Sequence, residues 1–115
     1  MELKSITVKK LLRLYATGER DFTGIKLIWT PSGRTLSGLN LSGVDFTGSS
    51  LGGFIDCAEI NLSGANLSGL DLSHFNFEGA DLSGTDLSGA DLWRANLDRV
   101  NLSGSNLSSA ILQDT

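Results

Sequence analysis

His74 is the only histidine among the 115 residues and the first candidate for acid–base or metal chemistry. A general base needs a nucleophile within hydrogen-bond reach, and the repeat described below makes Arg94 its neighbour in the adjacent layer. Because no second histidine exists, a histidine-rich metal site is excluded. We therefore expect neither catalysis nor metal binding by His74.

Cys57 is the only cysteine, so the chain has no intramolecular disulfide. It occupies a repeat position whose side chains are expected to point inward. A buried thiol behaves as a small hydrophobe with a raised pKa. We expect Cys57 to be structural and unreactive.

Aspartate recurs just before the central residue of the repeat, where it alternates freely with asparagine. These aspartates are Asp45, Asp56, Asp71, Asp81, Asp86 and Asp91. The interchange indicates a hydrogen-bonding role in turns that both side chains can fill, not acid chemistry. No paired catalytic carboxylates, nucleophile elbow or phosphate-binding loop is present. The sequence predicts a protein that is not an enzyme and needs no cofactor or metal.

Charge is divided unevenly along the chain. Residues 1–34 carry seven basic and three acidic side chains, a net charge of +4, whereas residues 35–115 carry two basic and ten acidic ones, a net charge of −8. The acidic part should repel nucleic acid, so direct binding of DNA or RNA is not expected. No apolar run resembles a membrane span or a signal peptide. We expect a soluble cytoplasmic protein with no membrane partner.

A five-residue repeat dominates the sequence from Leu36 onward. Its central positions are Leu36, Leu41, Phe46, Leu51, Cys57, Leu62, Leu67, Leu72, Phe77, Leu82, Leu87, Leu92, Leu97, Leu102, Leu107 and Leu112. One extra residue near Gly53-Phe54 interrupts the count. A small or apolar residue usually stands two before the centre, and Ser-Gly commonly follows it.

A period of five matches neither a helix nor a long strand. It fits a short extended segment followed by a tight turn, with glycine supplying the positive φ of a type II turn. Turns of one hand would wind the chain into stacked layers about 4.8 Å apart. The central residues would then form a continuous apolar core.

The units ANLSG (65–69), ADLSG (80–84) and TDLSG (85–89) resemble the motif of the pentapeptide-repeat family. The stretch 11–27 is similar to the N-terminal segment of small cyanobacterial members. The resemblance implies an all-β fold, a right-handed quadrilateral β-helix, with four repeats per coil and about four and a half coils here. The predicted organisation is one domain with an N-terminal segment over 1–19 and the β-helix over 20–115.

A short α-helix is predicted over residues 7–17, with Thr7 as its N-cap and Gly18 as a C-cap candidate. Its expected task is to cover the open end of the β-helix, where unpaired strand edges invite aggregation. Residues 29–34 contain the only proline and predict a loop within the first coil.

Four steps per coil place aromatic and charged residues on two adjacent faces, while the other two faces read as plain scaffold. The predicted protein-binding surface comprises His74, Trp93, Arg94, Arg99, Glu59, Glu78 and Asp98. An exposed tryptophan beside an arginine is typical of interface anchors. The alternative is that these charges merely keep the protein in solution.

The leading functional hypothesis is a non-enzymatic scaffold or interaction module for an unknown protein partner. The family resemblance implies an alternative, because some members mimic duplex DNA and bind DNA gyrase or topoisomerase IV, which agrees with the acidic coils. A homodimer through the C-terminal coil is a further expectation, with Ile111 and Leu112 at its contact.

Overall fold

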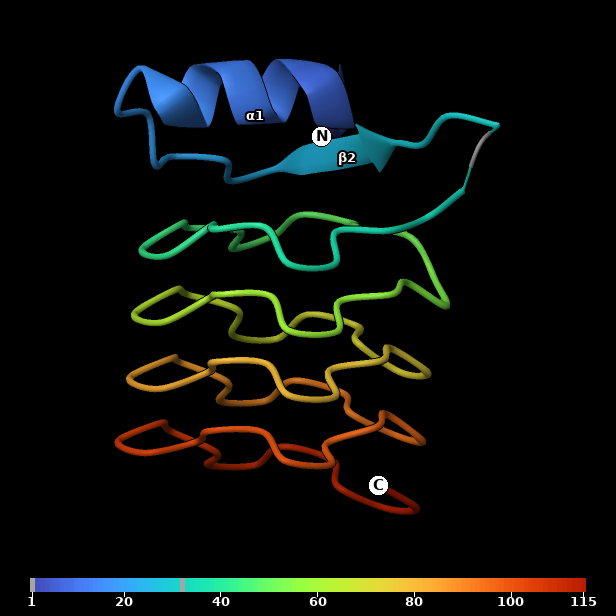
Figure 1. Cartoon of the computed structure of the whole chain (residues 1–115), viewed down its shortest axis with the longest axis vertical. Helices are drawn as coiled ribbons and strands as arrows, with labels where there is room; N and C mark the ends of the chain where they lie inside the picture. The colour runs from blue at the N-terminus through green and yellow to red at the C-terminus, as the bar shows by residue number, and fades with distance from the viewer. Residues whose placement is uncertain (1, 32) are drawn as a thin grey trace.

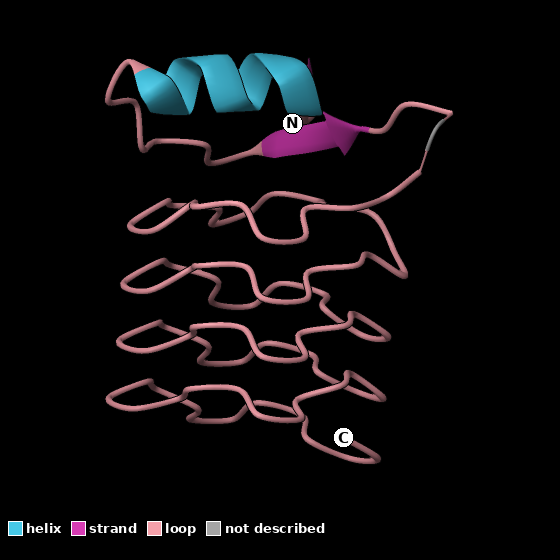
Figure 2. Cartoon of the chain, viewed as in Figure 1, coloured by secondary structure: helices cyan, strands magenta, loops and turns pink. Residues whose placement is uncertain are grey.

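The computed structural model describes residues 2–31 and 33–115, and the chain winds into a stack of coils (Figure 1). Three regular elements come first: β1 (Lys4–Thr7), α1 (Val8–Ala16) and β2 (Ile25–Ile28). They lie at one end of the stack, and the C-terminus lies at the other (Figure 1). Most of the remaining chain consists of turns and single-residue bridges, which Figure 2 draws as loop.

Each five-residue unit pairs with the next coil through a bridge too short to count as a strand. The Leu62 N–H donates to the Asp81 carbonyl at 2.9 Å, and the Asp81 N–H donates to the Ile60 carbonyl at 2.9 Å. Paired positions such as Asp56 and Asn76 are 20 residues apart. The repeat therefore forms a parallel ladder one unit wide on each side of the coil.

Type II turns join the units, as the Ser-Gly pairs predict. At Ser63-Gly64, the Ala65 N–H donates to the Leu62 carbonyl at 3.0 Å, and Gly64 has a φ of +69°. Glycine takes this left-handed conformation without the steric conflict that a Cβ would create. The turn hypothesis is confirmed.

The Asn or Asp before a centre closes its own turn through its side chain. Asn61 Oδ1 accepts from the Ser63 N–H at 3.0 Å, and Asp81 Oδ1 accepts from the Ser83 N–H at the same distance. An amide oxygen and a carboxylate oxygen therefore accept the same backbone hydrogen bond at this position. The predicted turn role of the aspartates is confirmed.

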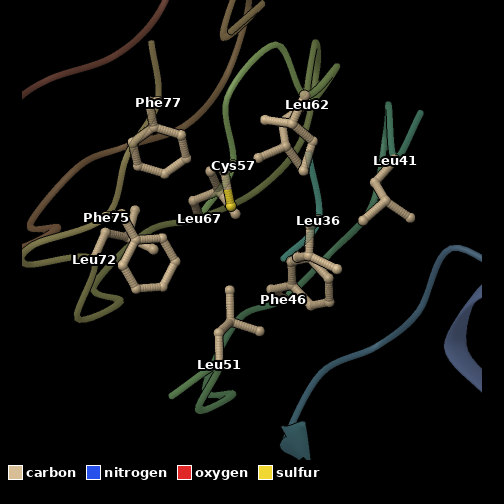
Figure 3. A pocket seen from close by; sticks show the side chains of 11 residues that line it. Leu36, Leu41, Phe46, Leu51, Cys57, Leu62, Leu67, Leu72, Phe75 and Phe77 are labelled. Carbon is tan, nitrogen blue, oxygen red and sulfur yellow. The ribbon is translucent and has the colours of Figure 1, made fainter. Parts of the chain in front are cut away.

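The core is the column of side chains from the central positions and from the positions two before them. Figure 3 shows them meeting in the interior, with Phe75 and Phe77 in one repeat at a ring separation of 5.6 Å. The free volume among them is about 10 Å³, which leaves no room for more than a single water. Cys57 lies in this core and is 2% exposed, as predicted.

Helix α1 begins at its predicted N-cap, where Thr7 Oγ1 accepts from the Lys10 N–H at 3.1 Å. Leu11 is fully buried, and the Tyr15 hydroxyl donates to the Ser42 carbonyl at 2.8 Å. The helix is thereby fixed to the stack. Gly18, with a φ of +101°, lies one residue beyond the observed C-cap, Thr17.

Strand β1 was not anticipated from the sequence. It pairs in parallel with β2, with Lys4 opposite Ile25 and Thr7 opposite Ile28. Part of the predicted N-terminal segment thus adds a strand to the first coil.

The first coil is longer than the others, since the bridged pair Asp21 and Asp45 is 24 residues apart. The predicted loop over 29–34 supplies the extra length, although Ser32 lies outside the described residues. Within it, the Trp29 indole donates to the Leu51 carbonyl at 2.8 Å.

Candidate protein-binding surface

The corners of the stack differ in which residues adopt a positive φ. One corner carries only glycine there, at Gly43, Gly64, Gly84 and Gly104. On the opposite face, the turns that follow Leu51, Leu72, Leu92 and Leu112 have non-glycine residues at positive φ. These residues are Phe54, His74, Arg94 and Asp114, with φ from +56° to +63°. An L-residue in this region is strained by about 1–2 kcal/mol. Non-glycine residues at such positions often mark functional sites.

Three rings and one guanidinium contact one another along this corner. The Phe54 and His74 rings stack with centroids 4.5 Å apart, and the His74 and Trp93 rings meet edge to face at 5.0 Å. The Arg94 guanidinium lies 5.0 Å from the Trp93 ring centroid. We call these four residues the corner ladder, because three successive coils supply Phe54, then His74, then Trp93 and Arg94.

The bridges between coils position the corner ladder. The His74 N–H donates to the Trp93 carbonyl at 2.9 Å, which aligns the two turns. The Trp93 N–H in turn donates to Asp91 Oδ1 at 2.9 Å. Backbone hydrogen bonds between coils therefore hold the turns of His74, Trp93 and Arg94 in register, whereas the Phe54 N–H has no backbone acceptor within the described chain.

The corner ladder is open to solvent and rich in unused hydrogen-bond donors. Phe54 is 72% exposed and Trp93 is 38% exposed. Within the described chain, neither the His74 ring, the Trp93 indole nor the Arg94 guanidinium has a hydrogen-bond acceptor. The corner ladder is therefore an exposed cluster of aromatic and cationic side chains.

The other predicted residues lie on the neighbouring corner and form a separate set. Arg99 forms an ion pair with Glu78 and is not a free charge. Glu59 lies against Gly79, where a Cβ would come within 3.3 Å of Glu59 Cγ. Asp98 is exposed. Within the described chain, no hydrogen bond, ion pair or ring contact joins these four side chains to the corner ladder.

Phe54 is the member of the corner ladder that the sequence prediction missed. The extra residue near Gly53 broke the five-residue count at this point, so Phe54 was not aligned with His74 and Arg94. The signal in the sequence was that His74 and Arg94 both stand where other turns of the repeat have glycine.

Ile111 and Leu112, the predicted dimer contact, are 45% and 41% exposed. Their exposure fits the expectation. Dimerisation itself stays a prediction.

The acidic and thiol groups that attracted attention in the sequence have structural roles. Hydrogen bonds from Ser83 lower the pKa of Asp81, and those from Ser88 lower the pKa of Asp86. Burial raises the pKa of the Cys57 thiol well above its ordinary value, and the Asp56 charge adds to this. Such a thiol is a poor nucleophile at neutral pH.

Across residues 2–31 and 33–115, no cluster of three or more His, Cys, Asp or Glu side chains could hold a metal ion. None of the helices found in these two ranges has the length and apolar character needed to cross a membrane.

Comparison with known proteins gives a consistent result. The family profile described as Pentapeptide repeats (8 copies) matches residues 60–92 and 76–114. The structure of a pentapeptide repeat protein from Nostoc Pcc 7120 is 36% identical, over 93% of this chain and 79% of that chain, with a TM-score of 0.46. A search of the curated proteins finds no significant match.

This chain covers a smaller share of two further similar structures. Rfr23, a pentapeptide repeat protein from the cyanobacterium Cyanothece 51142, is 26% identical, over 79% of this chain and 63% of that chain, with a TM-score of 0.56. A pentapeptide repeat protein from the Arabidopsis thaliana thylakoid lumen is 30% identical, over 87% and 60%, with a TM-score of 0.50. This chain spans less than two thirds of either protein.

Five-residue units joined by parallel bridges, with side chains displayed at the corners, define a solenoid repeat protein. The chain belongs to the pentapeptide repeat family, whose members form right-handed quadrilateral β-helices. The resemblance read from ANLSG and its neighbouring units is confirmed.

Proposed function

We propose that this protein is a non-enzymatic interaction module that binds a partner protein through the corner ladder. In this proposal it is a short stack of about four and a half coils, closed at one end by α1 and located in the cytoplasm. The observation that carries the proposal is the contact of Phe54, His74 and Trp93 on one exposed corner.

The energetic cost of the corner supports a binding role. His74 and Arg94 stand where glycine would be free of strain, and most other turns of the stack have glycine there. Residues that break a local rule without a structural gain are often functional. Their side chains are exposed or half-buried, so packing does not account for them.

The partner is expected to cover the aromatic rings and to supply acceptors. Rings that stack on one another leave their edges and the Arg94 guanidinium facing outward. Tryptophan and arginine anchors of this kind supply most of the binding energy at many interfaces. Arg99, Glu59, Glu78 and Asp98 would form the rim of the same surface, where charges contribute less.

Affinity capture with a variant that restores the repeat consensus tests the proposal. In His74→Gly, Trp93→Ser, Arg94→Gly, the corner becomes Ser-Gly and loses its strain, so the fold should be kept. The matched control, Glu59→Gly, Arg99→Gly, relieves strain at the neighbouring corner and leaves the ladder intact.

We expect a partner that the wild type and the control retain and the ladder variant loses. Retention of the same proteins by all three would contradict the proposal. If topoisomerase subunits dominate the capture and survive in the ladder variant, mimicry of DNA by the acidic coils is the better account.

A further inference from the structure

Basic side chains gather on the elements that close one end of the stack. From Leu3 to Gly18 the chain has four cations and no acidic residue, with Glu2 and Glu19 just outside this range. The cations lie on β1 and α1, at the end that Figure 1 draws at the top. We call them the cap surface, and all are exposed: Lys4, Lys9, Lys10 and Arg13.

The packing of α1 turns two of these cations away from the stack. Leu11 is fully buried, and Lys9 and Arg13 each lie two residues from it, about 160° around the helix. In the described chain, the sole ion pair joins Arg99 to Glu78, so no ion pair neutralises the cap surface. Its charge is therefore available to a partner.

The cations of α1 run against the preferences of a helix. Lys9 and Lys10 lie in the first turn, where the helix dipole favours acidic side chains, and that turn has none. Lys9 and Arg13 also form a like-charge pair one turn apart, which opposes helix formation. Residues that break local rules without a structural gain are often functional. A structural role therefore does not account for the three cations of α1.

A recess of about 340 Å³ lies beside the same helix. Val8, Leu12 and Trp29 line it together with Lys9. The three apolar side chains are half-buried. A ligand that contacts Lys9 can therefore also place an apolar group against the stack.

These observations favour a protein segment over other anions. A phosphate backbone carries no apolar side chain for the recess, and a long nucleic acid would also meet the coils, which have a net charge of −8 over residues 35–115. An anionic bilayer binds helices whose apolar face can insert, but Leu11 on that face of α1 is buried in the stack.

We infer that the cap surface binds a short acidic segment of a partner protein, with one apolar side chain of the segment in the recess beside α1. Lys9 and Arg13 are about 6 Å apart along the helix axis. Alternate residues of an extended segment are about 6.7 Å apart and point to the same side, so carboxylates at positions i and i+2 match both cations. The site does not depend on the corner ladder.

NMR titration of the whole chain with the peptide ESESL, blocked at both ends, tests the inference. We expect saturable shifts of the Lys9 and Arg13 amide signals, with a Kd on the order of 1 mM at low salt. The neutral peptide QSQSL should bind about tenfold more weakly because it lacks the charges. The peptide ESESS, which lacks the apolar side chain, should also bind more weakly.

Two matched double variants locate the site. Lys9→Gln, Arg13→Gln removes two charges from α1 but keeps good helix formers, and should weaken the binding of ESESL about tenfold. It should melt at a temperature at least as high as the wild type, because the like-charge pair is gone. Arg94→Gln, Arg99→Gln removes the same charge near the other end of the stack, where the Arg94 N–H donates to the Gln113 carbonyl. This control should bind ESESL as the wild type does.

The inference is overturned if ESESL gives no saturable shift, if QSQSL or ESESS binds equally well, or if the α1 variant binds normally. Self-association of the wild type that the α1 variant loses would also overturn it, because the acidic coils of a second copy would then occupy the cap surface. The consensus variant of the corner ladder should still bind ESESL. That comparison separates failure of this site from failure of the proposed function.

Discussion

At the residue scale, most turns of the repeat are closed by a side-chain acceptor two residues before the N–H that it binds. Asp81 and Asp86 each accept from the hydroxyl and the N–H of the following serine, and these bonds lower the pKa of both carboxyls. A carboxylate whose pKa is lowered in the folded state adds stability above its unfolded pKa. That stability is lost as the pH falls through the folded pKa.

We predict that Asp81→Asn, Asp86→Asn is less sensitive to acid than the wild type, because asparagine keeps the turn acceptor and does not titrate. Thermal unfolding at pH 7 and at about pH 3 measures the difference. Asp98→Asn, which removes a carboxylate that closes no turn, is the control. Equal losses of melting temperature in the double variant and the wild type would refute the turn explanation.

Positive φ at non-glycine residues should be measurable as strain. Ser109 has a φ of +60° and is exposed, and no side-chain contact within the described chain supports it. We predict that Ser109→Gly raises the free energy of unfolding by about 0.5–1 kcal/mol. The reverse change, Gly84→Ser at a φ of +65°, should lower it by about 1 kcal/mol. Urea denaturation measures the free energy of unfolding of both variants. A loss of stability in Ser109→Gly would show that other interactions compensate the strain at Ser109.

At the element scale, the repeating unit could be predicted from the sequence because one rule acts at every position. Leu62 points inward, Asn61 closes the turn and Gly64 supplies the positive φ, so spacing alone gives the local structure. Helix α1 could also be predicted from the sequence, since Thr7 marks its N-cap and Leu11 lies on its apolar face.

Elements that depend on distant partners could not be predicted. Strand β1 has four residues, and its partner β2 lies 21 positions later, so no local pattern reveals the pairing. Phe54 and the missing bridge between Ser50 and Asp71 were hidden because one extra residue shifts the register between two coils. The contact between Phe54 and His74 becomes apparent only in the folded stack.

The packing of α1 gives a third prediction. Leu11 is fully buried, so Leu11→Ala should lower the free energy of unfolding by about 2–5 kcal/mol. Arg13→Ala, an exposed change on the same helix, should leave it within about 0.5 kcal/mol. If the two variants are equally stable in urea, α1 does not stabilise the stack.

At the scale of the whole molecule, a basic N-terminal part is joined to acidic coils, and the side chains of the corner ladder follow one edge of those coils. The sequence predicted this distribution of charge and placed His74, Trp93 and Arg94 together. The ion pair between Arg99 and Glu78 was not foreseen, because it joins turns of two coils whose side-chain conformations the spacing does not fix.

The proposed homodimer belongs to this scale. Leu112→Lys places a charge on the exposed apolar pair Ile111 and Leu112, and we predict that it converts a dimer into a monomer. Light scattering coupled to size-exclusion chromatography measures the mass of both proteins. A dimer that survives the substitution, or a wild type that is monomeric at high concentration, would rule out this contact.

The most direct measurement for the corner ladder is photo-crosslinking from position 54 in source-cell lysate. With a benzoylphenylalanine in place of Phe54, we predict one dominant crosslinked protein, lost when Trp93→Ser and Arg94→Gly are added. The same probe at Ser103, on the glycine corner, should not capture it. Equal capture from Ser103, or capture that is indifferent to Trp93 and Arg94, would contradict a binding surface at this corner.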